Sequence, residues 1–226
     1  MSAKAVREYH GKLLTSRWLN NYSGETTYDL EDRCLLIGPE TNMSTLADAN
    51  PWLKETNLVC KPDQLIKRRG KAGLLGINKT WEEAQAWITE RRNKEMQVEV
   101  VSGILDHFIV EPFVPHEQSD EYYICLQSYR NNDEILFHHE GGVDVGDVDS
   151  KGVRLSISLG DEPTSQQIKE VLLSQGKVKH QDYLAGFILA LTSEGVQWLL
   201  ATSFFQFFGR ISYSLYLVHC LFINWL

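Results

Sequence analysis

Residues 58–77, LVCKPDQLIKRRGKAGLLGI, hold two short apolar runs on either side of a strongly basic segment. The first run ends at Pro62 and the second begins at Leu74. Apolar runs bounded by Pro and Gly are typical of strands, so this stretch predicts a β-hairpin with a basic loop. Just after it, residues 80–83 (TWEE) form a capping box, which predicts a helix running to about Arg92.

Further along the chain, alternating or continuously apolar runs predict three more strands, at Phe108–Glu111, Tyr122–Tyr129 and Glu134–His139. The polar residues 131–133 predict a hairpin turn between the last two strands. A second capping box, Thr164 with Gln167, predicts a helix over about 165–175. Gly176 stands where the left-handed residue that ends such a helix belongs. The pattern as a whole predicts a mixed α+β fold.

The composition excludes several classes of protein. The 226 residues carry 22 Lys and Arg against 30 Asp and Glu, a formal charge of −8, which disfavours a basic nucleic-acid binder. The four cysteines lie far apart and form no CxxC pair, which disfavours a structural zinc site and favours a reducing compartment. Charged residues interrupt each apolar run near the N-terminus before the apolar core of a signal peptide could form. We therefore expect a cytoplasmic protein.

The basic segment 61–71 carries five cations and one carboxylate, which indicates an anionic partner for this part of an acidic protein. Lys61, at the strand end, would supply a fixed point charge. Arg68 and Arg69 can bind phosphate oxygens in a bidentate manner. Gly70 would let the backbone approach a ligand where a Cβ atom would clash. The alternative interpretation is a solvated charged turn, the ordinary role of a charge run.

A second segment, residues 108–116 (FIVEPFVPH), has two prolines within four residues. Proline stiffens the chain, so we expect an extended segment whose backbone groups can face a planar heterocycle. Glu121, a few residues later, is placed to accept hydrogen bonds from the hydroxyls of a sugar. The alternative interpretation is a rigid connection between strands.

A third segment, residues 137–149 (FHHEGGVDVGDVD), contains two histidines that resemble metal ligands. Consecutive strand residues point to opposite faces, which disfavours one ion shared by His138 and His139. The glycines suit close contact with phosphate, and the acidic residues suit Mg²⁺ or a polar network. The chain has neither GxxxxGK[ST] nor GxGxxG, so its phosphate chemistry would belong to another fold.

These three segments, in this order, closely resemble the N-terminal region of the ATP-citrate lyase family. The opening residues MSAK also match, as do residues 78–88 (NKTWEEAQAWI), in a form close to the fungal small subunit. The resemblance covers about residues 1–190 and is tightest over 51–150. It implies an ATP-grasp fold related to the β subunit of succinyl-CoA synthetase, in which ATP lies between two α+β subdomains.

The resemblance also implies which residues bind the nucleotide. They are Lys61, Arg69 and Gly70 on the phosphate side, Pro112 and Val114 at the hinge whose backbone meets adenine, and Glu121 on the ribose. The family converts citrate, CoA and ATP to acetyl-CoA, oxaloacetate, ADP and phosphate through a phosphorylated histidine. The family uses Mg²⁺ as a cofactor. A lyase module completes the enzyme, which assembles as a homo- or hetero-oligomer.

The chain also departs from the family. A Glu-Ile-Asn-Pro-Leu motif and a later aspartate, which help to hold Mg²⁺ in the family, are absent, as are the citrate- and CoA-binding regions and the phosphorylated histidine. We therefore assign no catalytic residue and no metal ligand, and expect the chain alone to be inactive, since phosphoryl transfer depends on the metal. The alternative is a non-catalytic nucleotide-binding remnant.

The composition changes near the C-terminus. Residues 195–226 contain one formal charge, Arg210, and nine of the chain's 24 aromatic residues. Residues 205–219 (FQFFGRISYSLYLVH) resemble a late transmembrane segment of the acyltransferase-3 membrane family. A fused gene model or membrane association through an apolar helical tail is therefore a further hypothesis. We expect three parts. Residues 1–50 form an N-terminal segment with a helix at about Lys4–Leu19. Residues 51–192 form a truncated nucleotide-binding domain, and residues 193–226 form the tail.

Overall fold

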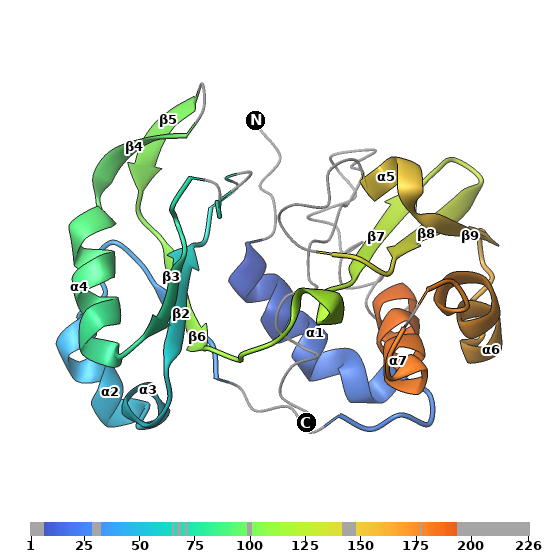
Figure 1. Ribbon diagram of the computed structural model, residues 1–226, viewed down its shortest axis with the longest axis horizontal. Helices are drawn as coiled ribbons and strands as arrows, with labels where there is room; N and C mark the ends of the chain where they lie inside the picture. The colour runs from blue at the N-terminus through green and yellow to red at the C-terminus, as the bar shows by residue number, and fades with distance from the viewer. Residues whose placement is uncertain are drawn as a thin grey trace. The chain divides into compact units, whose positions relative to one another are not determined.

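The computed structural model describes residues 7–28, 33–64, 66, 69–70, 72–98, 101–141, 148–176 and 178–193. They form two compact units, each built on its own antiparallel sheet (Figure 1). The four-stranded unit holds residues 7–11 and 33–115, and the three-stranded unit holds 12–28 and 116–193. The apolar tail and its resemblance to acyltransferase-3 lie outside the described residues. Within those residues, no helix combines the length and the apolar character that a membrane span requires.

The sheet of the four-stranded unit has the order β1-β6-β2-β3, with every pair antiparallel. Its strands are β1 (Leu35–Ile37), β2 (Leu58–Pro62), β3 (Gly76–Lys79) and β6 (Phe108–Pro112). The predicted hairpin is confirmed as the β2–β3 pair, although β3 begins two residues later than expected. Leu74 instead belongs to the loop, where its N–H donates to the Arg69 carbonyl at 2.9 Å.

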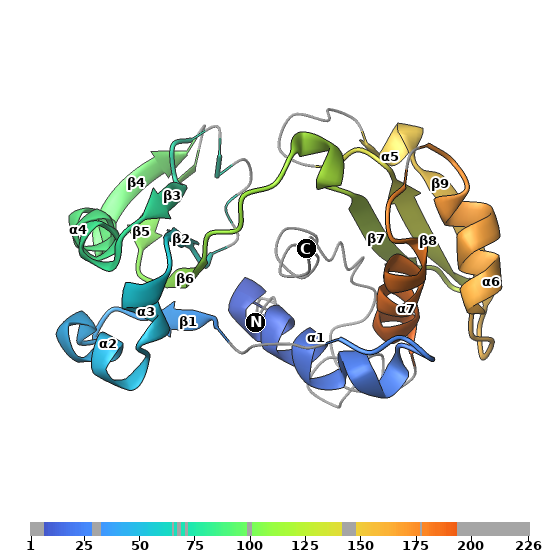
Figure 2. The ribbon, with the colours of Figure 1, turned by 60° about the horizontal axis from the view of Figure 1, so that its bottom comes forward.

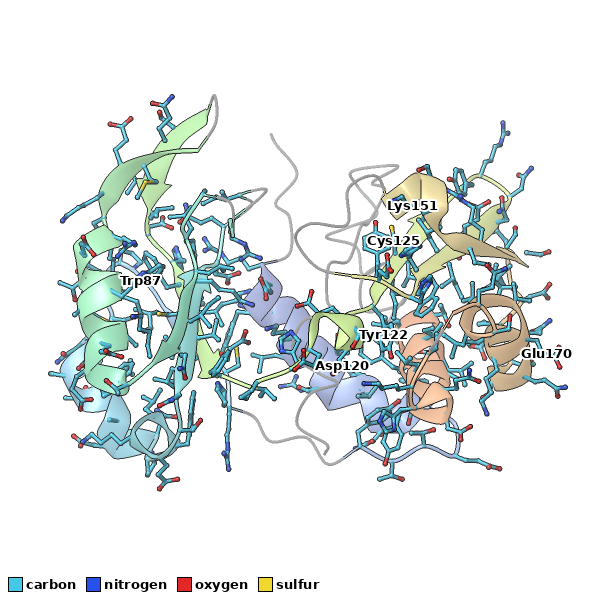
Figure 3. The ribbon with its side chains drawn as sticks, viewed as in Figure 1. Trp87, Asp120, Tyr122, Cys125, Lys151 and Glu170 are labelled. Atoms are coloured by element: carbon cyan, nitrogen blue, oxygen red, sulfur yellow. The ribbon has the colours of Figure 1, made fainter. Side chains whose placement is uncertain are left out.

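Helix α4 (Trp81–Arg91) confirms the predicted capping box. Thr80 Oγ1 accepts from the Glu83 N–H at 3.3 Å, and the Glu83 carboxylate accepts from the Thr80 N–H at 3.0 Å. Ala84 and Ile88 on this helix are fully buried in the core of the unit. Trp87, labelled on α4 in Figure 3, meets Phe108 of β6 edge-on, with ring centroids 6.0 Å apart. The helix therefore packs on the sheet that carries the basic loop.

Shorter elements complete the four-stranded unit. They are the single-turn helices η1 (Met43–Thr45), α2 (Leu46–Ala49) and α3 (Trp52–Glu55), and the hairpin of β4 (Lys94–Val98) with β5 (Val101–Leu105). Met43, Ala47 and Leu53 anchor the three short helices in the apolar core.

The three-stranded unit is built on β7 (Tyr123–Ser128), β8 (Asn132–His138) and β9 (Val153–Ser158), in that order. The two predicted strands are thus confirmed as β7 and β8. The connection between them, residues 129–131, lies two residues earlier than the expected turn at 131–133, because Asn132 already pairs with Ser158 of β9. The Tyr129 N–H closes this turn by donating to the Asn132 carbonyl at 2.8 Å. The short helices η2 (Gln118–Asp120) and α5 (Val148–Lys151) flank the sheet strands in sequence.

Helices supply the rest of the core of the three-stranded unit (Figure 2). The predicted helix at 165–175 is an α-helical turn, α6 (Ser165–Gln167), continued by a π-helix, η3 (Ile168–Leu173). Its capping box is confirmed, and Gly176 has φ +83° as expected. Helix α7 (Gln181–Thr192) buries Leu184, Phe187 and Ile188 in the same apolar core as residues of β7 and β8.

Helix α1 (Glu8–Tyr22) is the observed form of the helix predicted at Lys4–Leu19, and it ends three residues later. Residues 1–6 lie outside the described part of the chain, so the predicted start is not described. Residues 8–11 of α1 belong to the four-stranded unit, and the rest of α1 belongs to the three-stranded unit.

Candidate nucleotide-binding site

Lys61 is a buried cation held between two carboxylates. It lies on β2, and its side chain is only 7% exposed. Its Nζ lies 2.6 Å from Glu8 Oε1 and 2.9 Å from Glu111 Oε1. Glu111 reaches it because β2 and β6 are paired with Lys61 opposite Ile109, which makes Glu111 the diagonal neighbour on the same face. The ammonium is therefore fixed in position, as expected of a point charge on a strand.

Arg69 meets the same Glu8 carboxylate from the loop. Its Nη2 lies 2.8 Å from Glu8 Oε2, and its Nη1 donates to the Pro62 carbonyl at 2.7 Å. Gly70 follows at a turn, where its carbonyl accepts from the Gly73 N–H at 3.1 Å. The structure thus brings three predicted phosphate-side residues to the end of β2. The other cations of the loop, Lys67, Arg68 and Lys71, lie outside the described residues.

The first turn of α1 is fastened to the end of β2 by Asp63. The Asp63 Oδ1 accepts from the Glu8 N–H at 2.9 Å, and the Arg7 guanidinium donates to the Asp63 carbonyl at 3.0 Å. A carboxylate at this position satisfies an unpaired N–H and complements the helix dipole. Asp63 Oδ2 is buried and has no hydrogen-bond partner within the described residues. Burial, together with the nearby Glu8 charge, raises the pKa of Asp63 above its usual range.

Pro112 and Val114 lie where β6 leaves the sheet. Pro112 is the last residue of β6 and pairs with Leu58 of β2. The next N–H, that of Phe113, donates to the Asn57 carbonyl at 2.7 Å, after which residues 113–117 are neither helix nor strand. This irregular connection begins directly beside the strand that carries Lys61.

Glu121 belongs to the three-stranded unit, whereas the other five predicted contacts belong to the four-stranded unit. Its Oε1 lies 2.8 Å from His116 Nε2, and its carbonyl accepts from the Gly141 N–H at 2.7 Å. A Cβ atom on Gly141 would lie 2.7 Å from the backbone of Tyr122, so only glycine allows this approach. The Glu121 carboxylate is thus held by a histidine of the loop that precedes it.

Neighbouring contacts brace the loop around Glu121. Asp120 and Tyr122, both labelled in Figure 3, flank it in sequence. The Lys179 ammonium lies 2.5 Å from Asp120, and the Lys179 N–H donates to the Tyr122 hydroxyl at 3.0 Å. This hydrogen-bonded ion pair lowers the pKa of Asp120 and raises the pKa of Lys179.

The two histidines of the third segment differ from the expectation of opposite faces. Strand β8 ends at His138, so His139 is not held in the strand alternation, and the two rings stack with centroids 4.8 Å apart. His138 Nδ1 lies 3.1 Å from the Glu140 N–H nitrogen. Among the described residues, no three His, Cys, Asp or Glu side chains gather as a metal site. Residues 142–147 of the segment are not among them.

Four residues of this site were missed by reasoning from the sequence: Glu8, Asp63, Glu111 and His116. Glu111 could have been found, because pairing the two predicted strands places it diagonally to Lys61. Glu8 carried no such signal, since it lies 61 positions before Arg69 and reaches it only through the fold.

Comparison with known proteins decides the family. Residues 2–197 match the model of the ATP-citrate synthase ATP-grasp domain. The chain belongs to this family. Its sequence is 42% identical over 193 residues to human ATP-citrate synthase. This match covers 84% of the chain and 17% of the human protein. It is 41% identical over 220 residues to the probable ATP-citrate synthase subunit 2 of Schizosaccharomyces pombe, covering 85% of the chain and 45% of the relative.

Solved structures agree with this assignment. The ATP citrate lyase of Methanothrix soehngenii, solved with citrate and coenzyme A, matches with 33% sequence identity and a TM-score of 0.64. The match covers 84% of this chain and 43% of that one. The predicted resemblance to ATP-citrate lyase, including its fungal subunit form, is therefore confirmed, and this ATP-grasp chain spans less than half the length of each of these three relatives.

Proposed function

We propose that this chain is the ATP-binding part of an ATP-citrate synthase. Lys61, Arg69 and Gly70 bind the phosphates, and the backbone at Pro112 and Val114 binds adenine. Glu121 binds the ribose. The observation that carries the proposal is the buried Lys61 ammonium, which shares one carboxylate with Arg69 at the end of β2. Two cations gathered at one point are suited to phosphate oxygens.

The complete enzyme would convert citrate, CoA and ATP to acetyl-CoA, oxaloacetate, ADP and phosphate in the cytoplasm. The match covers 17% of human ATP-citrate synthase and 45% of the fungal subunit, and in this proposal the citrate and CoA sites and the lyase module lie in the parts of the enzyme that the match does not cover. The chain alone would bind nucleotide without turning it over. Assembly with a lyase-module subunit, in a homo- or hetero-oligomer, would supply the remaining chemistry.

Mg²⁺ is the cofactor that the family implies, and the described carboxylates do not fit it. Glu8 and Glu111 both bind the Lys61 ammonium, and within the described ranges no cluster of ligating side chains is arranged for a metal. We therefore assign no step of the reaction to a metal held by this chain.

Calorimetric titration of the 226-residue chain with ATP and with adenosine tests the proposal. ATP is expected to bind more tightly than adenosine, because only ATP carries the phosphates that Lys61 and Arg69 would contact. Equal affinities for the two ligands would refute a phosphate site at the end of β2. A parallel assay for acetyl-CoA formation from citrate, CoA and ATP is expected to show no turnover by the chain alone.

A further inference from the structure

One carboxylate, that of Glu8, joins the two side-chain cations that the proposed function assigns to the phosphates. Its Oε1 lies 2.6 Å from Lys61 Nζ, and its Oε2 lies 2.8 Å from Arg69 Nη2. We propose that Glu8 is an internal stand-in for a nucleotide phosphate, which holds these cations before ATP binds and is displaced when ATP binds. This inference rests on the proposed function, since it needs the phosphates to bind at Lys61 and Arg69.

The geometry of the contact is that of a bound oxyanion. Two oxygens of one group each accept a short, charge-assisted hydrogen bond from a different cation, as two oxygens of a phosphate would. A phosphate placed on the same two donors would need the positions that the Glu8 oxygens hold. One group or the other can occupy them, so a phosphate that takes these two N–H donors must displace Glu8 from them.

The charges point the same way. Lys61 and Arg69 carry two positive charges, and Glu8 and Glu111 carry two negative charges, so these four side chains balance one another. A triphosphate that entered with Glu8 still in place would bring like charges together in a partly buried site, where repulsion is weakly screened. Removal of the Glu8 carboxylate from the cations leaves them with a net positive charge toward the phosphates.

Glu8 rather than Glu111 is the group that can leave. Glu111 lies within strand β6, and its side chain is 6% exposed. The Glu8 side chain is 15% exposed, and it can rotate around its three side-chain bonds. Its backbone meanwhile stays fastened to Asp63 through the 2.9 Å hydrogen bond from the Glu8 N–H. Displacement therefore needs rotation of one side chain and leaves the first turn of α1 in place.

Two consequences follow for binding. Without ATP, Glu8 accepts hydrogen bonds from both Lys61 and Arg69, and Glu111 pairs with Lys61 as well, so the two cations remain paired. With ATP, the phosphates must compete with Glu8, which weakens their apparent affinity. Adenosine has no phosphate to exchange with the carboxylate, so its affinity does not depend on Glu8.

The test is titration calorimetry of the full chain carrying Glu8→Gln, with ATP and with adenosine. The amide keeps the size of the side chain and removes its charge, and we expect about tenfold tighter binding of ATP, equivalent to about 1.4 kcal/mol. Adenosine binding is expected to stay unchanged. Glu90→Gln is the matched control, because Glu90 undergoes the same change of charge on the exposed side of α4 and pairs with Arg91 instead. Unchanged or weaker binding of ATP by Glu8→Gln would overturn the inference.

A second measurement does not depend on a substitution that alters folding. In protein labelled with ¹³C at glutamate carboxyl groups, the Glu8 resonance, assigned by its loss in Glu8→Gln, is followed during titration with tripolyphosphate. We expect it to move with tripolyphosphate and to stay in place with adenosine. A fixed resonance, while tripolyphosphate binds, would refute displacement and leave the phosphate site standing. Failure of tripolyphosphate to bind would instead refute the proposed function, and the inference with it.

Discussion

The Lys61 ammonium on β2 lies 2.9 Å from the Glu111 carboxylate on β6, and both side chains are more than 90% buried. A buried ion pair of this kind contributes little net stability, but removal of one partner leaves an uncompensated charge in the interior. Lys61 and Glu111 therefore constrain one another energetically, apart from any role in ligand binding.

This relationship predicts strong coupling between the two residues. Lys61→Met is expected to lower the free energy of unfolding by about 3–5 kcal/mol, because it removes the ammonium that lies 2.9 Å from the buried Glu111 carboxylate. The double variant Lys61→Met with Glu111→Gln should recover part of the loss, since it buries no unpaired charge at these two positions. Urea denaturation of the two single variants and the double variant measures the coupling. Additive losses would contradict it.

Asp63 predicts a distinct dependence of stability on pH. Its pKa in the folded protein is raised above its ordinary value of 3.8, chiefly by burial, so the folded state holds this proton after the unfolded state has lost it. The contribution of Asp63 to stability is therefore greatest below pH 3.8 and declines as the pH rises toward the folded pKa.

Urea denaturation of the wild type and of Asp63→Asn between pH 3 and pH 7 tests this sign. The difference in unfolding free energy between them should shift in favour of the variant as the pH rises. The same series with Asp48→Asn, an exposed aspartate of the same unit, accounts for the loss of one negative charge. A difference that shifts in favour of the wild type would show that ionised Asp63 is stabilised in the fold.

Gly76 predicts a steric effect at the start of β3. A Cβ atom there would lie 2.5 Å from Cys60 Sγ and 3.1 Å from the Trp87 ring. Gly76→Ala should therefore destabilise the four-stranded unit by about 1–3 kcal/mol through overpacking. Gly103→Ala in β5 is the control, because nothing lies within 4 Å of its added Cβ. Thermal denaturation should show a loss for Gly76→Ala that Cys60→Ala partly reverses; equal stability of the two glycine variants would exclude the clash.

The elements predicted correctly are those with a local physical signal. Strands β2 and β6 are bounded by prolines, and the capping boxes at Thr80 and Thr164 start their helices through side-chain hydrogen bonds that the sequence specifies. Such signals act over three or four residues, so a single chain segment is sufficient to recognise them.

The elements that were missed lack such signals or depend on distant pairing. Strand β9 (Val153–Ser158) alternates between partly buried and exposed residues, but its six residues include only three large apolar side chains, a weak signal for a strand. Helix α7 begins after His180, which has φ 52° and no side-chain cap, so nothing local marks its start. The β4–β5 hairpin places Leu105 in the core and Met96 against it, contacts that depend on how the rest of the unit folds.

The candidate site likewise contains residues that the sequence predicts and partners that only the fold reveals. Residue chemistry and the family resemblance single out Lys61, Arg69 and Glu121 as predicted contacts, because each stands in a distinctive local motif. Their carboxylate and histidine partners were not found in advance, since Glu8 and His116 act through side-chain contacts that appear only in the folded chain.

Substitution of the predicted phosphate residue and of the predicted ribose residue should affect the binding of ATP and adenosine in two different ways. Lys61→Ala should weaken ATP far more than adenosine, because only the phosphates meet that ammonium. Loss of one charge-assisted contact corresponds to about 1.5–3 kcal/mol, or about 10- to 150-fold in affinity. Glu121→Ala should weaken both ligands by similar factors, since both carry the ribose.

Matched controls distinguish these effects from a general change of charge. Lys54→Ala removes an exposed cation of α3, and Glu117→Ala removes an exposed carboxylate near Glu121. Both controls should bind ATP and adenosine as the wild type does. Calorimetric titration of the four variants, each checked by circular dichroism, gives the two ratios directly. Equal effects of Lys61→Ala on the binding of ATP and adenosine would refute the assignment of Lys61 to the phosphates. An effect of Glu121→Ala confined to ATP would refute the assignment of Glu121 to the ribose.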